Sequence, residues 1–138
     1  MKPVYTHTEN GTTICKLQDK SNNIVYGYSF LHPEEPEASD FTGEYIATIR
    51  AEINYYKLIR KNELLPQVKT LNHLLTCITN TGSKKYNPDS PEAKLIRKQY
   101  WMAKSDYEAI GEIIQQLEET LSSYLKGRDK LIGQIKEI

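Results

Sequence analysis

Residues 96–124 read IRKQYWMAKSDYEAIGEIIQQLEETLSSY and belong to the most regular pattern in the chain. From Ile96 to the C-terminal Ile138, apolar or aromatic residues recur in steps of three and four, and Arg128 is the single charged residue in this seam. An apolar seam of this kind is typical of coiled-coil packing. Asp89-Ser90-Pro91-Glu92 supplies a cap, a first-turn proline and a first-turn acid. The pattern therefore predicts one long helix over residues 90–138.

A helix of this length would span about 70 Å, which is more than a 138-residue globule can bury. It must fold back on an earlier helix, pair with another chain, or do both, and we favour a homo-oligomer, a dimer or higher. The earlier helix is expected over residues 40–81, with a kink or break near Pro66. Its expected apolar face is Ile46, Ile49, Ile53, Tyr56 and Ile59.

The first third of the chain has the alternation of β-strands. Three β-prone runs, at residues 4–8, 13–17 and 24–31, are separated by an Asn10-Gly11 turn and a polar turn. In the third run Ile24, Tyr26, Tyr28 and Phe30 share one face. The expected fold class is α+β in one domain, residues 1–138. A three-stranded antiparallel sheet (residues 1–32) precedes a long antiparallel helical hairpin or coiled coil.

Composition narrows the function classes. Lys and Arg (18) balance Asp and Glu (18), which argues against a general DNA-binding protein. No apolar run is long enough for a membrane span, and the N-terminus lacks the apolar core of a secretion signal. Cys15 and Cys77 are expected to be packed thiols of a cytosolic protein. We expect no membrane partner and no DNA partner.

Motifs for catalysis are missing from the sequence. His7, His32 and His73 lie near no nucleophile or metal-binding pattern, and no Gly-rich phosphate loop or hydrolase motif is present. We therefore expect no enzyme activity, no metal and no cofactor.

A lysine-rich segment between the two helical patterns is the first candidate binding site. It contains Lys84, Lys85, Tyr86 and Asn87, which offer charge for phosphate, a ring for stacking and an amide for a base edge. The alternative interpretation is a solvated turn between helices.

Arg50 is the second candidate, because it interrupts a stretch of small and apolar residues near the start of a helix. Such an arginine can approach a phosphate bidentately. The alternative is a salt bridge to Glu44 or Asp40. Arg97 lies on the helix that follows the lysine-rich segment and would face the same region if that segment folds over a ligand.

Several motifs together resemble one family. They are TTICKL at residues 12–17 and LHPEEPEASDFTGEYIATIRAEINYY at residues 31–56, where an HP-E turn precedes G-x-x-IA-x-x-RA, with the KKYN segment and the long C-terminal helix. In these features the chain resembles phage anti-Thoeris proteins of the sponge type. The resemblance implies an N-terminal sheet, two long helices and assembly through them. It also implies that the protein acts in the host bacterial cytoplasm. There it would sequester, without cutting it, a cyclic ADP-ribose isomer or related cyclic nucleotide made by a TIR enzyme.

The same resemblance implies roles for the candidate residues. Arg50, and after it Arg97, would hold the pyrophosphate. Tyr86 would stack on adenine, Asn87 would read its edge, and Lys84 and Lys85 would add positive field. The alternative function is a coiled-coil adaptor or a protein inhibitor acting through protein–protein contacts. The first function needs Arg50 and the lysine-rich segment in one pocket, whereas the second needs an exposed apolar patch.

Overall fold

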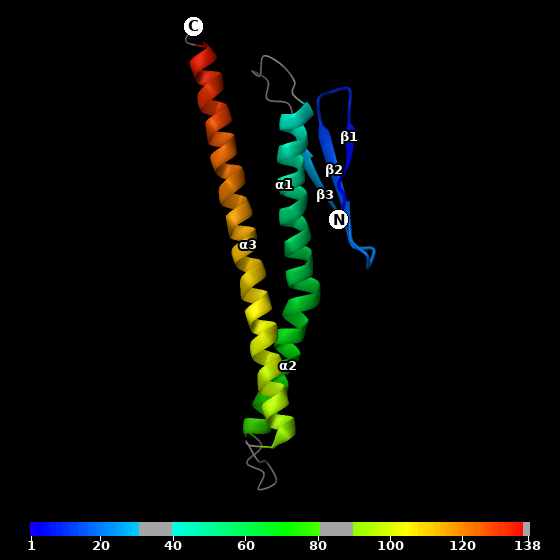
Figure 1. Ribbon diagram of the computed structural model, residues 1–138, viewed down its shortest axis with the longest axis vertical. Coiled ribbons are helices and arrows are strands. Elements are labelled where there is room, and N and C mark those ends of the chain that lie inside the picture. Colours follow the sequence, from blue (N-terminus) through cyan, green and yellow to red (C-terminus); the bar gives the residue numbers. More distant parts are fainter. Residues whose placement is uncertain (31–39, 81–89, 137–138) are drawn as a thin grey trace. The chain divides into compact units, whose positions relative to one another are not determined.

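A computed structural model describes residues 1–30, 40–80 and 90–136. The expected α+β class is confirmed: a three-stranded antiparallel sheet is followed by helices (Figure 1). The strands are β1 (Val4–His7), β2 (Thr13–Gln18) and β3 (Ile24–Ser29), in the order β1-β2-β3. The helical elements are α1 (Asp40–Ile59), the π-helical η1 (Arg60–Leu64), α2 (Leu65–Asn80) and α3 (Pro91–Lys136). The helical hairpin and the coiled coil stay predictions.

The two turns of the sheet follow from residues that tolerate positive φ. Gly11 has a φ of 84° in the first turn, where the Thr8 N–H donates to the Thr12 carbonyl at 2.9 Å. Asn22 has a φ of 64° in the second turn. There the Asp19 carboxylate accepts hydrogen bonds from Asn23, which lower the pKa of Asp19. The sequence predicted both turns from these residue types.

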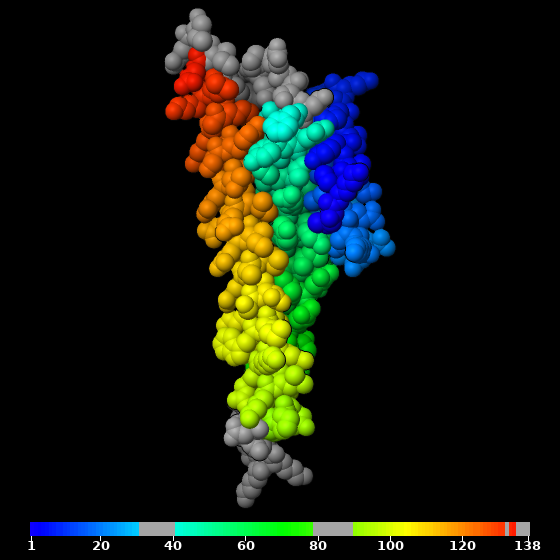
Figure 2. All heavy atoms as spheres, viewed as in Figure 1, coloured from blue at the N-terminus to red at the C-terminus, as the bar shows by residue number. Residues whose placement is uncertain are grey.

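Helix α1 packs very closely on the inner face of the sheet (Figures 1 and 2). A Cβ at Gly27 of β3 would overlap the backbone of Ala47 and Ala51, so only glycine permits this approach. Ala47 and Ala51 are fully buried. The other buried apolar residues of the N-terminal half are Cys15, Leu17, Val25, Ile46, Ile49 and Ile53. Three of them, Ile46, Ile49 and Ile53, belong to the predicted apolar face of α1.

The two cysteines differ in environment. Cys15 is buried under α1, and this burial raises the pKa of its thiol. Cys77 is exposed on α2, so the expectation of a packed thiol there was wrong. Val68, Leu71, Leu75 and Ile78 of α2 are half-buried, as their spacing predicted. Cys77 falls between these positions, and helical phase therefore turns it outward despite its residue type.

The interruption expected near Pro66 takes the form of the π-helical segment η1. The Leu65 N–H bonds to the Arg60 carbonyl, five residues earlier. Pro66 follows directly and has no N–H to donate to the preceding turn. The wider turn ends where α2 begins, with proline in the first turn, where its missing donor costs least.

Contacts divide the chain into two compact units, which we describe separately. Unit 1 comprises residues 1–57 and 114–138, and unit 2 comprises residues 58–113. Along α3 the predicted seam positions from Ile96 to Arg128 are buried or half-buried, whereas Leu131 is 58% exposed. In unit 1 the Tyr124 ring lies 4.7 Å from that of Tyr45. Among the described helices, none combines the length and apolar character of a membrane span.

Candidate functional site

Two polar side chains of α1 reach the free edge of β3. Arg50 Nη1 donates to the Tyr28 carbonyl at 2.8 Å, and Asn54 Nδ2 donates to the Tyr26 carbonyl at 2.8 Å. Arg50 and Asn54 are one helical turn apart, and the carbonyls of Tyr26 and Tyr28 are two strand residues apart. Each of these spacings is about 6 to 7 Å. This match explains how both bonds form at once. It also occupies carbonyls that would otherwise pair with an added strand.

A hollow opens beside these bonds in unit 1. It has a volume of about 420 Å³ and is lined by Tyr28, Phe30, Arg50, Ile53 and Asn54. The side chains of Tyr28 and Phe30 are exposed, at 45% and 67%. A hollow of this size accommodates a small ligand. Its lining residues include a cation, two aromatic residues and an amide.

Arg50 is not neutralised by a carboxylate in the described part of the chain. Glu44, one of the two acids considered for it, lies 2.8 Å from His7 Nε2 instead. The side chain of Asp40, the other acid, lies outside what the structure describes. Burial, followed by the positive charge of Arg128, lowers the pKa of Arg50. Within the described residues, one of its N–H groups is bonded to Tyr28, and a guanidinium has five N–H donors, so this part of the chain leaves donors for an anion.

Arg128 of α3 is a second arginine of unit 1 with unusual surroundings. Its Nε is buried and has no hydrogen-bond partner among the described residues. Asp129 Oδ1 forms an ion pair with it at 3.6 Å, which is too far for a hydrogen bond. The signal that could have identified it was present, because Arg128 is the single charged residue in the seam.

The structure does not place the other predicted site residues relative to this hollow. Lys84, Lys85, Tyr86 and Asn87 lie outside the described residues. Arg97 belongs to unit 2, where its Nε is 3.5 Å from the carbonyl of Ala93 on its own helix. Of the six predicted residues, Arg50 alone therefore has described surroundings that suit a ligand.

A larger hollow lies in unit 2, with a volume of about 610 Å³. Asp106 is the only charged residue in its lining, which is otherwise polar or apolar: Pro66, Gln67, Thr70, Leu71, Gln99, Met102 and Ala103. A carboxylate repels phosphate, so this hollow is a poorer site for a nucleotide than the one at Arg50.

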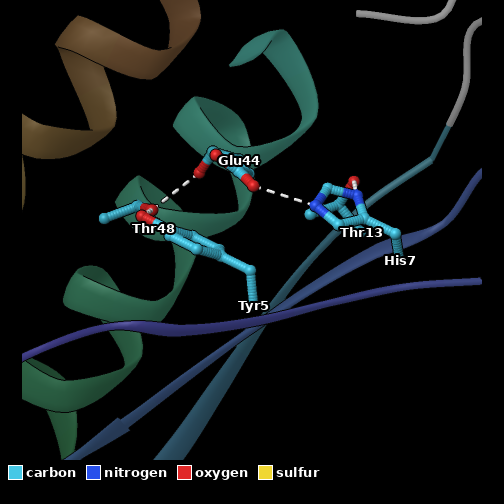
Figure 3. Close-up of polar contacts among 5 residues, drawn as sticks. All are labelled: Tyr5, His7, Thr13, Glu44 and Thr48. Atoms are coloured by element: carbon cyan, nitrogen blue, oxygen red, sulfur yellow. Dashed lines mark hydrogen bonds and ion pairs between the residues drawn. The ribbon is translucent and has the colours of Figure 1, made fainter. Parts of the chain in front are cut away.

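A polar cluster joins the sheet to the start of α1 (Figure 3). His7 Nε2 faces the Glu44 carboxylate, and Thr13 Oγ1 lies 3.3 Å from His7 Nδ1. Hydroxyl, imidazole and carboxylate in this order could in principle activate a nucleophile. However, Thr13 is buried, and Gly43 of α1 lies so close to it that a Cβ there would overlap its hydroxyl. We interpret the cluster as a structural contact that connects β1 and β2 to the start of α1.

Comparison with protein-family models, curated proteins and solved structures finds no match for this chain. Within residues 1–30, 40–80 and 90–136, no group of three or more His, Cys, Asp and Glu side chains is placed to hold a metal ion.

Proposed function

We propose that the protein binds and sequesters a cyclic ADP-ribose signalling nucleotide without degrading it. In this role it is a phage anti-defence protein that blocks Thoeris immunity in the host bacterial cytoplasm. The observation that carries the proposal is the hollow at Arg50, where a guanidinium without a carboxylate partner among the described residues lies beside exposed aromatic rings.

Each lining group suits one part of such a ligand. The Arg50 guanidinium suits the pyrophosphate, because charge-assisted hydrogen bonds to phosphate are strong. The exposed rings of Tyr28 and Phe30 suit stacking on adenine. Asn54 uses its Nδ2 on the Tyr26 carbonyl, and its Oδ1 suits the exocyclic amine of the base. Lys84, Lys85, Tyr86, Asn87 and Arg97 remain predicted contributors.

A second candidate function is favoured by a different observation. The outer face of β3 presents Ile24, Tyr26, Tyr28 and Phe30, each of them at least 42% exposed. An exposed apolar strip of this kind marks protein–protein contact surfaces, where tyrosine is enriched. It supports a coiled-coil adaptor or a protein inhibitor.

Calorimetric titration with cyclic ADP-ribose isomers distinguishes the two functions. The bound ligand is then released by heat and examined by chromatography. Tight binding with intact ligand recovered supports sequestration, and a changed product would instead indicate an enzyme. Absence of binding to every isomer would refute the proposal and leave the protein-binding alternative.

We also propose that the chain forms a homo-oligomer through α3. Leu131 continues the seam but is 58% exposed within one chain, which suits a contact with another copy. Leu131→Asp should lower the mass measured by light scattering, with helix content by circular dichroism unchanged. Gly133→Asp, at a nearby position with nothing within 4 Å, is the control. An unchanged mass in Leu131→Asp would contradict the proposal.

A further inference from the structure

Of the two cysteines, Cys77 is the exposed one, and it lies beside a histidine on α2. Its Sγ is 3.5 Å from Nε2 of His73. The two residues are four positions apart on one helix, so their side chains lie on the same side, one turn from each other. Both residues are exposed, and neither lines the hollow that α2 forms with α3 in unit 2. Packing therefore explains neither residue type.

The separation of these two donor atoms matches that of two ligands on one zinc ion. Zinc binds a cysteine sulfur at about 2.3 Å and a histidine nitrogen at about 2.0 to 2.1 Å, with tetrahedral geometry. At the tetrahedral angle these bond lengths place sulfur and nitrogen about 3.5 to 3.6 Å apart. The observed distance of 3.5 Å agrees with this value. One metal ion can therefore contact both atoms without a change in the helix backbone.

The ligand types select the class of metal. A thiolate with an imidazole suits zinc and similar borderline-soft ions, whereas magnesium and calcium prefer oxygen ligands. Coordination requires the thiolate of Cys77 and a lone pair on Nε2 of His73. Binding to the neutral pair therefore releases one proton to solvent, and the imidazole keeps its remaining hydrogen on Nδ1. The metal then replaces the hydrogen bond between Sγ and Nε2.

We propose that His73 and Cys77 form a two-ligand site for zinc or a similar divalent metal ion. Since no group of three or more potential ligands occurs in the described part of the chain, water or an external donor fills the remaining positions. An open site of this kind binds metal reversibly, unlike a closed structural zinc site with four protein ligands. Lys69, exposed one turn before His73, lowers the affinity by repulsion. The inference is independent of the proposed nucleotide binding.

The alternative explanation is an exposed hydrogen bond between neighbours on a helix. Sulfur is a weak donor and acceptor, and a separation of 3.5 Å also suits such a bond. The two explanations differ in the response to zinc, because a hydrogen bond alone predicts no metal binding. A thiol can also bind zinc without a histidine, so the test has to separate Cys77 acting alone from the pair.

The test measures the rate at which a maleimide labels Cys77 during titration with zinc sulfate. In the wild type, zinc should slow the labelling and a chelator should restore it, because a metal-bound thiolate is not free to react. In His73→Gln, the zinc concentration that gives half of this protection should rise about tenfold or more. Cys15 is fully buried and is the internal reference, since zinc should leave its labelling rate unchanged.

A matched control exchanges two exposed neighbours on α2. Asn72→His together with His73→Asn keeps the composition, but it turns the histidine by about 100° around the helix, away from Cys77. This exchange variant should need as much zinc as His73→Gln. Equal protection in the wild type and the exchange variant would show that the thiol acts alone and would overturn the site. Unchanged labelling of the wild type at every zinc concentration would overturn it as well.

Discussion

Arg50 and Arg60 lie ten residues apart on consecutive helical segments, yet their surroundings differ sharply. In unit 2 the Arg60 guanidinium lies 3.9 Å from the centre of the Tyr107 ring, and its Nε donates to the Tyr107 carbonyl at 3.1 Å. Gly111 leaves room for the Arg60 guanidinium, because a Cβ at position 111 would lie 2.6 Å from Arg60 Nη2. Arg50 in unit 1 forms one hydrogen bond with the described residues and has an open hollow beside it.

The difference separates a structural arginine from a candidate binding arginine. Arg60 joins η1 to α3 through a ring, a carbonyl and a glycine, so its cationic group is covered on one face and bonded. Arg50 donates to one carbonyl at the edge of β3 and lines a hollow that two exposed aromatic residues, Tyr28 and Phe30, also line. Substitution should therefore affect stability at Arg60 and ligand binding at Arg50.

The largest effect on stability is expected at Gly27, which allows α1, the helix that carries Arg50, to pack closely on β3. Gly27→Ala places a Cβ into the backbone of α1, and a backbone cannot move aside as a side chain can. We expect a loss of about 3 kcal/mol or more in the free energy of unfolding, at the upper end of overpacking costs. Urea unfolding followed by circular dichroism measures it.

The rate of thiol labelling shows whether the loss of stability in Gly27→Ala arises at the contact between α1 and β3. Cys15 pairs with Gly27 in the sheet register and is fully buried, so its labelling should accelerate in Gly27→Ala while that of exposed Cys77 stays fast. Gly127→Ala is the matched control, because nothing lies within 4 Å of a Cβ there. It should be neutral or stabilise α3 by about 0.5–1 kcal/mol. A Gly27→Ala protein as stable as the wild type would mean that α1 does not pack on β3 as described.

An intermediate effect is expected at Arg60. Arg60→Ala removes a cation–π contact and a charged hydrogen bond, which together stabilise the fold by about 2 kcal/mol. Urea unfolding should show this loss, and Lys61→Ala, an exposed neighbour, should change stability by less than about 0.5 kcal/mol. Equal stability of the two variants would show that Arg60 does not join η1 to α3.

A smaller effect is expected at Gly111. Alanine there displaces the end of a flexible side chain, which weakens the contact of Arg60 with Tyr107, but it also removes a glycine from the interior of α3. Removal of the glycine stabilises the helix by about 0.5–1 kcal/mol, so the net change in the free energy of unfolding should stay below about 1 kcal/mol. In Arg60→Ala the clash is absent, and Gly111→Ala should then be stabilising. A double-mutant cycle measures this change of sign, and additive values would contradict it.

Sequence reasoning predicted the features that depend on periodicity and turn chemistry. Alternation in residues 24–31 placed Tyr26, Tyr28 and Phe30 on one face, which the structure shows to be exposed. Helical spacing found Ile46, Ile49 and Ile53 of the core. Pro66 marked the position of η1 because proline removes a donor wherever it stands.

The features that were missed depend on long-range geometry. Nothing in the spacing indicated that Arg50 would reach the carbonyl of Tyr28, 22 residues earlier, because that bond depends on the close approach at Gly27. Cys77 was misassigned from residue type, although its phase on α2 was readable. Arg128 was visible as an exception in the seam, but the burial of its Nε depends on how α3 packs.

The most direct test of the account compares Arg50→Gln with Arg60→Gln in both nucleotide affinity and Tm. We predict that Arg50→Gln binds the cyclic ADP-ribose isomer about tenfold more weakly or worse, since a charged hydrogen bond to ligand is lost, while its Tm stays within a few degrees of the wild type. Arg60→Gln should bind as the wild type does and melt at a lower temperature. Wild-type affinity in Arg50→Gln would contradict the central claim that Arg50 serves the ligand.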